Sequence, residues 1–167
     1  MATPQTYIDE AKTELGITDT SLDTFFLTKF TDAYKKLRRV LINSKNNYIS
    51  ATTSLSVTTG DSSKSLASVD PAILRIRSVK FKNSADYYSP ITRNENIREY
   101  GDVDFRLLTT ITEYYVDGRT MYFGGQVNFT QSNCLYIVYV PAMPTLIATT
   151  SITEIPDDFH DVFVPYL

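Results

Sequence analysis

The only histidine of the chain, His160, lies among acidic residues in the run Asp157-Asp158-Phe159-His160-Asp161. If this run is an α-helix, Asp157 and Asp161 share one face, where both carboxylates could reach a metal ion or a transferred proton. The imidazole would then point about 100° away from that face. The alternative is a helix start whose aspartates interact with the positive end of the helix dipole. Because the chain offers a single imidazole ligand, we favour the helix start and predict no metal site.

Cys134 is the single cysteine and the other candidate for chemistry. A cysteine nucleophile needs a base, and only His160 could serve as one. A half-buried cysteine within a strand is the simpler interpretation, and one cysteine cannot form an internal disulfide. The pair Gly124-Gly125 is followed by neither a lysine nor a helix, so it does not make a phosphate-binding loop. We therefore predict no catalytic residue and no cofactor.

Two groups of residues could contact nucleic acid. The pairs Tyr114-Tyr115 and Tyr122-Phe123 could stack on bases, but only Arg119 is a nearby cation, so we favour packing within a sheet. The net charge of −3 also argues against a dedicated nucleic-acid binder. Four cations could contact a DNA backbone: Lys35, Lys36, Arg38 and Arg39. They also suit the outer face and the end of a helix, and we favour this second interpretation.

Two amphipathic helices are predicted at the start of the chain, over Pro4 to about Leu15 and over Ser21 to about Ile42. Thr3 caps the first helix, Pro4 suits its first position, and Gly16 ends it. Because the link between the helices is short, we expect an antiparallel helical hairpin over residues 1–43.

Residues 47–145 are rich in β-branched and aromatic residues and predict a β-rich core. The clearest signal is a hairpin around Asp117-Gly118, a two-residue turn that requires positive φ. That turn puts Tyr114, Val116, Met121 and Phe123 on one face and Tyr115 and Tyr122 on the other. The predicted strands are Tyr48–Thr59, Ile73–Lys82, Ile111–Val116, Thr120–Phe123 and a central one, Leu135–Val140.

Two segments are predicted to lie outside this core. Residues 87–105, interrupted by Pro90, are expected to be a long excursion from the sheet, the kind of loop that often carries contacts. Residues 155–167 are expected to form a C-terminal helix opened by Pro156. So short a helix must lie against a partner surface. Its apolar stripe comprises Phe159, Val162, Phe163, Tyr166 and Leu167.

The predicted fold class is therefore α+β in a single domain, with an N-terminal two-helix hairpin, a central antiparallel β-sheet or small sandwich, and a C-terminal helix. A content of 43% hydrophobic and 21% charged residues is ordinary for a globular protein. The twelve tyrosines and nine phenylalanines, without tryptophan, suit half-buried surfaces at subunit contacts. The sequence shows no secretion signal and no apolar stretch near the roughly 20 residues of a membrane span, so we expect an intracellular protein without membrane contact.

This layout resembles the head–tail connector (adaptor) proteins of tailed bacteriophages. The similarity rests on the segment Val69–Phe81 with its Arg-x-Arg-Ser-Val strand, the tyrosine-rich hairpin Tyr114–Phe123, and the proline-ended strand Leu135–Pro144. It also includes Ile155–Asp161, the Ile-Pro-acid-acid-aromatic-His-Asp opening of the last helix. In the family that helix runs on for several turns, whereas this chain ends soon after Pro165.

The resemblance implies a non-enzymatic virion protein of the neck, assembled in the host cytoplasm. It would form a ring, typically of twelve copies, that joins the portal protein to a tail or second adaptor protein. Genomic DNA would pass through the ring without sequence-specific binding. The alternatives are another tail or baseplate module, or a single-stranded nucleic-acid-binding β module that uses Tyr115 and Tyr122. The residues expected to dock on partners are Pro156, Phe159, Val162, Phe163, Tyr166 and Leu167, with Tyr88, Ile91 and Tyr100 in the excursion.

Overall fold

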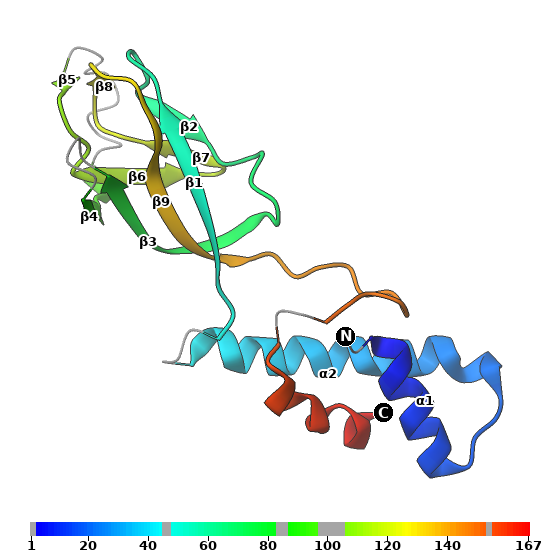
Figure 1. Cartoon of the computed structure of the whole chain (residues 1–167). Coiled ribbons are helices and arrows are strands. Elements are labelled where there is room, and N and C mark those ends of the chain that lie inside the picture. Colours follow the sequence, from blue (N-terminus) through cyan, green and yellow to red (C-terminus); the bar gives the residue numbers. More distant parts are fainter. Residues whose placement is uncertain (1–2, 45–47, 83–86, 97–105, 153–154) are drawn as a thin grey trace. The chain divides into compact units, whose positions relative to one another are not determined.

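The computed structural model of the protein describes residues 3–44, 48–82, 87–96, 106–152 and 155–167 (Figure 1). The chain divides into two compact units. We call residues 1–50 and 143–167 the helical unit, and residues 51–142 the β unit. No helix among the described residues is both long enough and apolar enough to cross a bilayer.

The helical unit contains α1 (Pro4–Leu15), a short 3₁₀ turn η1 (Thr20–Leu22) and α2 (Asp23–Asn43). The Thr3 hydroxyl accepts a hydrogen bond from the Thr6 N–H at 3.4 Å, and Gly16 ends α1 at φ 67°. Both predicted ends of the first helix are therefore confirmed. An ion pair between α1 and the start of α2, with 2.6 Å from Lys12 Nζ to Asp23 Oδ1, holds the link between them.

The predicted two-helix hairpin is wrong. Figure 1 shows the short α1 crossing the long α2 obliquely rather than lying along it. Besides the Lys12–Asp23 ion pair at the start of α2, the two helices meet at Phe30, whose ring stacks on that of Tyr7 at 5.6 Å. Further along α2, Tyr34 packs instead on Phe163 of the C-terminal segment, with 6.3 Å between ring centroids. The apolar stripe of α2 is thus shared between two covering segments, which periodicity alone cannot reveal.

The predicted C-terminal helix is also wrong. The segment forms two short 3₁₀ turns, η3 (Asp157–Val162) and η4 (Val164–Tyr166). The Phe163 N–H donates to the His160 carbonyl three residues back, at 3.0 Å, instead of continuing an α-helical ladder. Pro165 explains the change, because it has no N–H and its ring would clash with the carbonyl of Asp161 in an α-helix.

The β unit is a nearly closed mixed sheet of seven strands in the order β1-β9-β3-β4-β6-β7-β2. Neighbouring strands are antiparallel except β4 and β6, which run parallel, so the predicted antiparallel sheet or sandwich is wrong. A separate short parallel pair is formed by β5 and β8. The strands are β1 (Ala51–Val57), β2 (Ser63–Ser65), β3 (Ile73–Lys82), β4 (Tyr88–Arg93), β5 (Leu107–Leu108), β6 (Glu113–Asp117), β7 (Thr120–Tyr122), β8 (Gln126–Val127) and β9 (Gln131–Pro141).

Part of the predicted excursion belongs to the sheet. Strand β4 pairs with β3, with Pro90 opposite Lys80, although Pro90 argues against a strand. The other neighbour of β4 is β6, and the pairing of β4 with β6 begins only at Thr92. On that side of β4 no described strand lies opposite Pro90, so the missing N–H of Pro90 leaves no hydrogen bond of the sheet unmade. The rest of the excursion after residue 96, including Tyr100, lies outside the described residues until residue 106.

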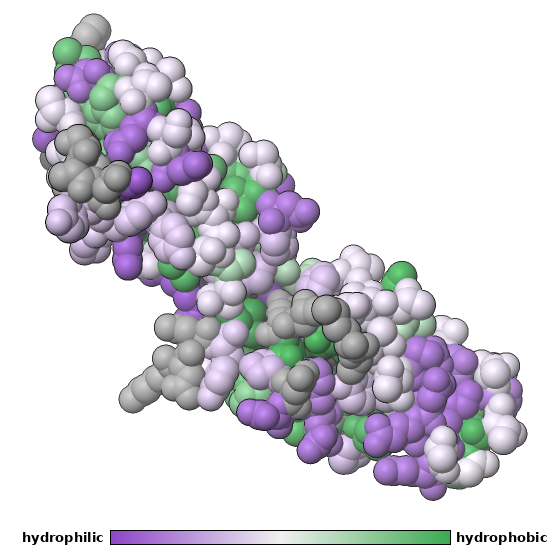
Figure 2. Space-filling model, viewed as in Figure 1, coloured by the Kyte–Doolittle hydropathy of each residue, from purple (hydrophilic) through white to green (hydrophobic). Residues whose placement is uncertain are grey.

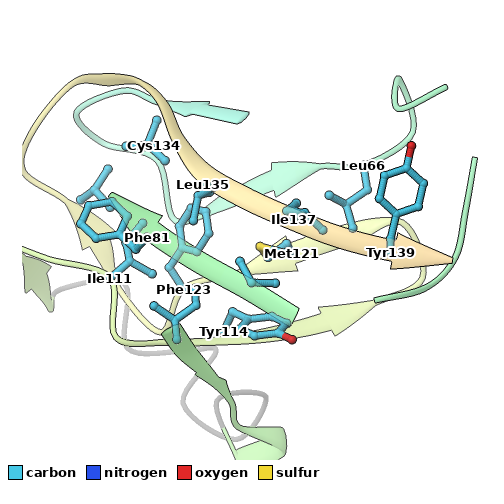
Figure 3. Close-up of a cluster of buried hydrophobic side chains, with 14 of the residues drawn as sticks. Leu66, Phe81, Ile111, Tyr114, Met121, Phe123, Cys134, Leu135, Ile137 and Tyr139 are labelled. Carbon is cyan, nitrogen blue, oxygen red and sulfur yellow. The ribbon is translucent and has the colours of Figure 1, made fainter. Parts of the chain in front are cut away.

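The remaining strand predictions are confirmed in their main features. The hairpin pairs Tyr115 with Tyr122 and Val116 with Met121 around Gly118, whose φ is 57°. Strand β9 is central, between β1 and β3. Figure 3 shows how its inward side chains meet those of β3 and the hairpin in one apolar core. That core includes Phe81, Tyr114, Met121, Phe123, Leu135, Ile137 and Tyr139.

Candidate functional site

The C-terminal segment, which we predicted to dock on partners, is anchored inside the helical unit by Phe163. This side chain is fully buried. Its ring centroid lies 4.7 Å from that of Phe30, 5.3 Å from Tyr7 and 6.3 Å from Tyr34. These rings come from α1 and α2, so the chain covers Phe163 with its own helices. Its apolar surface is therefore unavailable to a partner while the helical unit is folded.

His160 has a structural place beside this cluster. It is buried, and its Nε2 lies 3.0 Å from the Ile155 carbonyl oxygen. Because a carbonyl only accepts, Nε2 carries a proton and donates it. The imidazole also meets the Tyr7 ring edge-on at 5.7 Å. Nowhere in the described parts of the chain do three or more His, Cys, Asp or Glu residues gather as metal ligands would.

The 3₁₀ geometry changes which carboxylates share a face. In a 3₁₀ helix residues three apart are aligned, so Asp158 and Asp161 share one face, while the side chain of Asp157, which α-helical spacing pairs with Asp161, lies outside what the structure describes. Both are exposed, as are Val162 at 39% and Pro165. We call Asp158, Asp161 and Val162 the acidic face. The segment thus exposes two carboxylates and the apolar side chains of Val162 and Pro165, instead of an apolar stripe.

The other candidates in the segment are half-buried. Pro156, Phe159 and Leu167 each keep part of their surface accessible. The Phe159 ring packs edge-on against Tyr48 at 5.3 Å, which ties the segment to residues after α2. The side chain of Tyr166 lies outside what the structure describes.

The candidates on β4 separate into a core residue and a surface residue. Ile91 is buried in the apolar core, so it cannot dock on a partner as predicted. Tyr88 is 45% exposed and meets Tyr136 of β9 edge-on at 5.8 Å. Tyr87 beside it is 73% exposed. We call Tyr88 and Tyr136 the aromatic patch. The sequence analysis did not single out Tyr136, although the alternation along β9 already put it opposite the core residues, and it did not single out Tyr87.

The structure argues against part of each group of residues predicted to contact nucleic acid. Arg38 is buried at 4% exposure and cannot reach a DNA backbone. Lys36 and Arg39 are exposed, and so is Lys35, whose ammonium lies 3.7 Å from Asp32. Figure 2 shows hydrophilic residues gathered over α1 and the start of α2, at the other end of that helix. The proposed stacking pair is not open either, since Tyr115 is buried and only Tyr122 is exposed, at 40%.

Cys134 is a core residue of β9. Its Sγ–H donates to the Leu55 carbonyl at 3.7 Å, and burial raises the pKa of the thiol. A nucleophilic cysteine needs the opposite shift. Comparison of the chain with models of known protein families and with curated proteins finds no match.

Proposed function

We propose that this chain is a structural virion protein, a head–tail adaptor whose copies form a ring that joins the portal to the next tail component around the DNA channel. One observation carries the proposal. The two most specific blocks of the resemblance, Ile73–Phe81 and Ile155–Asp161, coincide with the segments that organise the two units. The first is β3, which pairs with β9 and β4 and buries Val79 and Phe81 in the core.

The second block closes the helical unit. Ile155 and His160 are buried, and the hydrogen bond between them shapes the turn that presents Phe163 to the helices. The resemblance therefore includes buried residues that shape each unit, such as Val79, Phe81, Ile155 and His160, beside exposed residues of the same blocks. This supports a relationship with the adaptor family in these two blocks, whereas the expected helical hairpin, antiparallel sheet and last helix do not match the structure.

The surface of the chain suits assembly. A ring adaptor contacts two neighbouring copies as well as the portal and the tail, and each contact needs a distinct surface. The aromatic patch offers tyrosine rings with apolar bodies and polar tips, which are enriched at subunit contacts. Large apolar side chains are also exposed on α2, where Phe25 and Val40 are 54% and 65% accessible.

The structure bears differently on the two alternative functions, a tail or baseplate module and a single-stranded nucleic-acid binder. A tail or baseplate module would draw on the same surfaces, and no observation favours it separately. The single-stranded nucleic-acid reading needs Tyr115 and Tyr122 together, and the burial of Tyr115 removes half of that pair.

The test is assembly on the portal. The full chain is mixed with the purified portal ring encoded in the same genome, and the product is weighed by sedimentation velocity and native mass spectrometry. We expect a discrete complex with a ring of adaptor copies on each portal. A capsid protein from the same genome serves as the negative control. If the chain stays monomeric with the portal and mass spectrometry does not find it in purified virions, the proposed function is wrong.

A further inference from the structure

The β unit has a cavity of about 230 Å³ that is lined by neither the aromatic patch nor the acidic face. Three arginines from separate elements line it: Arg75 of β3, Arg93 of β4 and Arg119 of the β6–β7 turn. Between them the lining is mainly apolar and includes Ile76, Tyr114 and Val116. We call this cavity the arginine cleft.

The cleft is cationic and accessible. All three arginines are exposed, and each contributes a cationic guanidinium group with several N–H donors. Within the described parts of the chain, neither Arg75 nor Arg119 has an ion-pair partner. Arg93 pairs with Glu95 at 2.9 Å, but both side chains are more than half exposed, so this contact is weak and easily exchanged.

The lining selects a class of ligand. Guanidinium groups match carboxylates in geometry as well as charge, and the apolar floor favours an apolar side chain next to them. The volume exceeds a cavity of about 150 Å³ that holds benzene, but it is below the roughly 300 Å³ at which small-molecule pockets begin. The cleft therefore suits one or two side chains of an acidic peptide segment better than a nucleotide.

The chain itself carries such a segment. The acidic face presents the aligned carboxylates of Asp158 and Asp161 beside the exposed Val162. No lysine or arginine follows Arg119 in the sequence, so no cation of the same segment neutralises these carboxylates. The acidic face also belongs to the more acidic of the two units. The helical unit spans seven Lys and Arg against ten Asp and Glu, whereas the β unit spans nine of each.

We propose that the acidic face of one copy docks into the arginine cleft of the next copy. The contact joins two different surfaces, and repeated head-to-tail contacts of this kind close into rings when the rotation allows. This inference rests on the proposed function for the ring, and it names the contact that holds neighbouring copies together.

Two charge-reversal variants test the contact. The cleft variant is Arg93→Glu with Arg119→Glu, and the face variant is Asp158→Lys with Asp161→Lys; all four side chains are exposed, so both should fold. A matched control, Lys80→Glu with Arg106→Glu, reverses two exposed cations of the β unit that do not line the cleft. Circular dichroism checks that each variant is folded.

Sedimentation velocity then follows self-association at low salt, for each protein alone and with the portal ring present. We expect each reversal to weaken association by at least about 100-fold and the control to leave it unchanged. An equimolar mixture of the cleft and face variants should regain association, because the native acidic face of the cleft variant meets the native arginine cleft of the face variant, and the reversed face meets the reversed cleft with opposite charge. Wild-type association should also weaken as salt rises.

The outcomes separate this contact from the proposed function. If the wild type assembles on the portal and the reversal variants do so equally well, the contact is wrong and the adaptor function stands. If the wild type does not bind the portal and is absent from virions, yet the variants lose self-association and their mixture regains it, the contact stands and the adaptor function fails. Loss in both variants without recovery in the mixture overturns the contact, and so does a wild type that never associates.

Discussion

Replacing Phe163 by alanine is expected to loosen the helical unit. The side chain is fully buried, and it contacts rings from both α1 and α2. Removing a buried phenylalanine ring typically costs about 3–5 kcal/mol, which combines the lost transfer free energy with the cavity left behind. A domain is stable by only about 5–15 kcal/mol, so Phe163→Ala removes a large share of the stability of this unit.

Hydrogen–deuterium exchange measures the effect separately in each part of the chain. At about 1.4 kcal/mol per factor of ten, amide exchange in α2 should accelerate by roughly 100- to 5,000-fold where it proceeds through unfolding of the unit. Amides of β9 should keep their rates, since the ring contacts found for Phe163 are with helical-unit residues.

Two controls sharpen the test. Phe163→Leu keeps most of the apolar volume and should cost much less than the alanine variant. Val162→Ala, one residue away but 39% exposed, should change exchange little. If Phe163→Ala leaves α2 exchange within threefold of wild type, or if Val162→Ala matches it, then the segment is not anchored as the packing indicates.

Three further predictions concern the Lys12–Asp23 ion pair, the turn residue Gly118 and the buried Cys134. Lys12→Ala breaks a largely buried charge-assisted hydrogen bond to Asp23 and should lower the free energy of urea unfolding by about 1–3 kcal/mol. The control Lys35→Ala breaks an exposed ion pair with Asp32 and should lower it by only about 0–1 kcal/mol. Equal losses in the two variants would contradict the difference in burial. Gly118→Ala places a Cβ at φ 57° and should cost about 1–2 kcal/mol in thermal unfolding, while Gly118→Asn should cost less because asparagine tolerates that conformation. Burial raises the pKa of the Cys134 thiol above its usual value near 8.5, so the protonated thiol stabilises the fold fully below that pH and less as pH rises through the folded pKa. Urea unfolding between pH 7 and 9.5 should therefore show a steeper loss of stability for the wild type than for Cys134→Ala, and parallel curves would count against this assignment.

Local chemistry made several elements predictable from the sequence. The ends of α1 follow from Thr3, Pro4 and Gly16, whose effects reach only a few residues. The hairpin register follows from Asp117-Gly118, because a two-residue turn decides which residues face each other. The bounds of β3 were also predictable, since its second half alternates between the buried Val79 and Phe81 and the polar residues beside them.

Other predictions failed because a distant partner decides the structure. Pro90 argued against a strand, yet β4 forms because β6 does not reach the position where an N–H would be needed. The parallel pairing of β4 with β6 leaves no local sign in either segment. At the C-terminus, apolar spacing predicted an α-helix, but Pro165 and the burial of Phe163 between α1 and α2 favour 3₁₀ turns.

The sequence alone therefore determined the type and ends of the locally specified elements, the absence of a recognisable catalytic motif, and the residues that carry the adaptor resemblance. Only the tertiary structure decided which of those residues are available to a partner. It buried Phe163, Ile91 and Arg38, and it brought Arg75, Arg93 and Arg119 together from three separate elements. Caps and turns act between neighbours in sequence, whereas burial and the grouping of charges depend on which distant segments pack together.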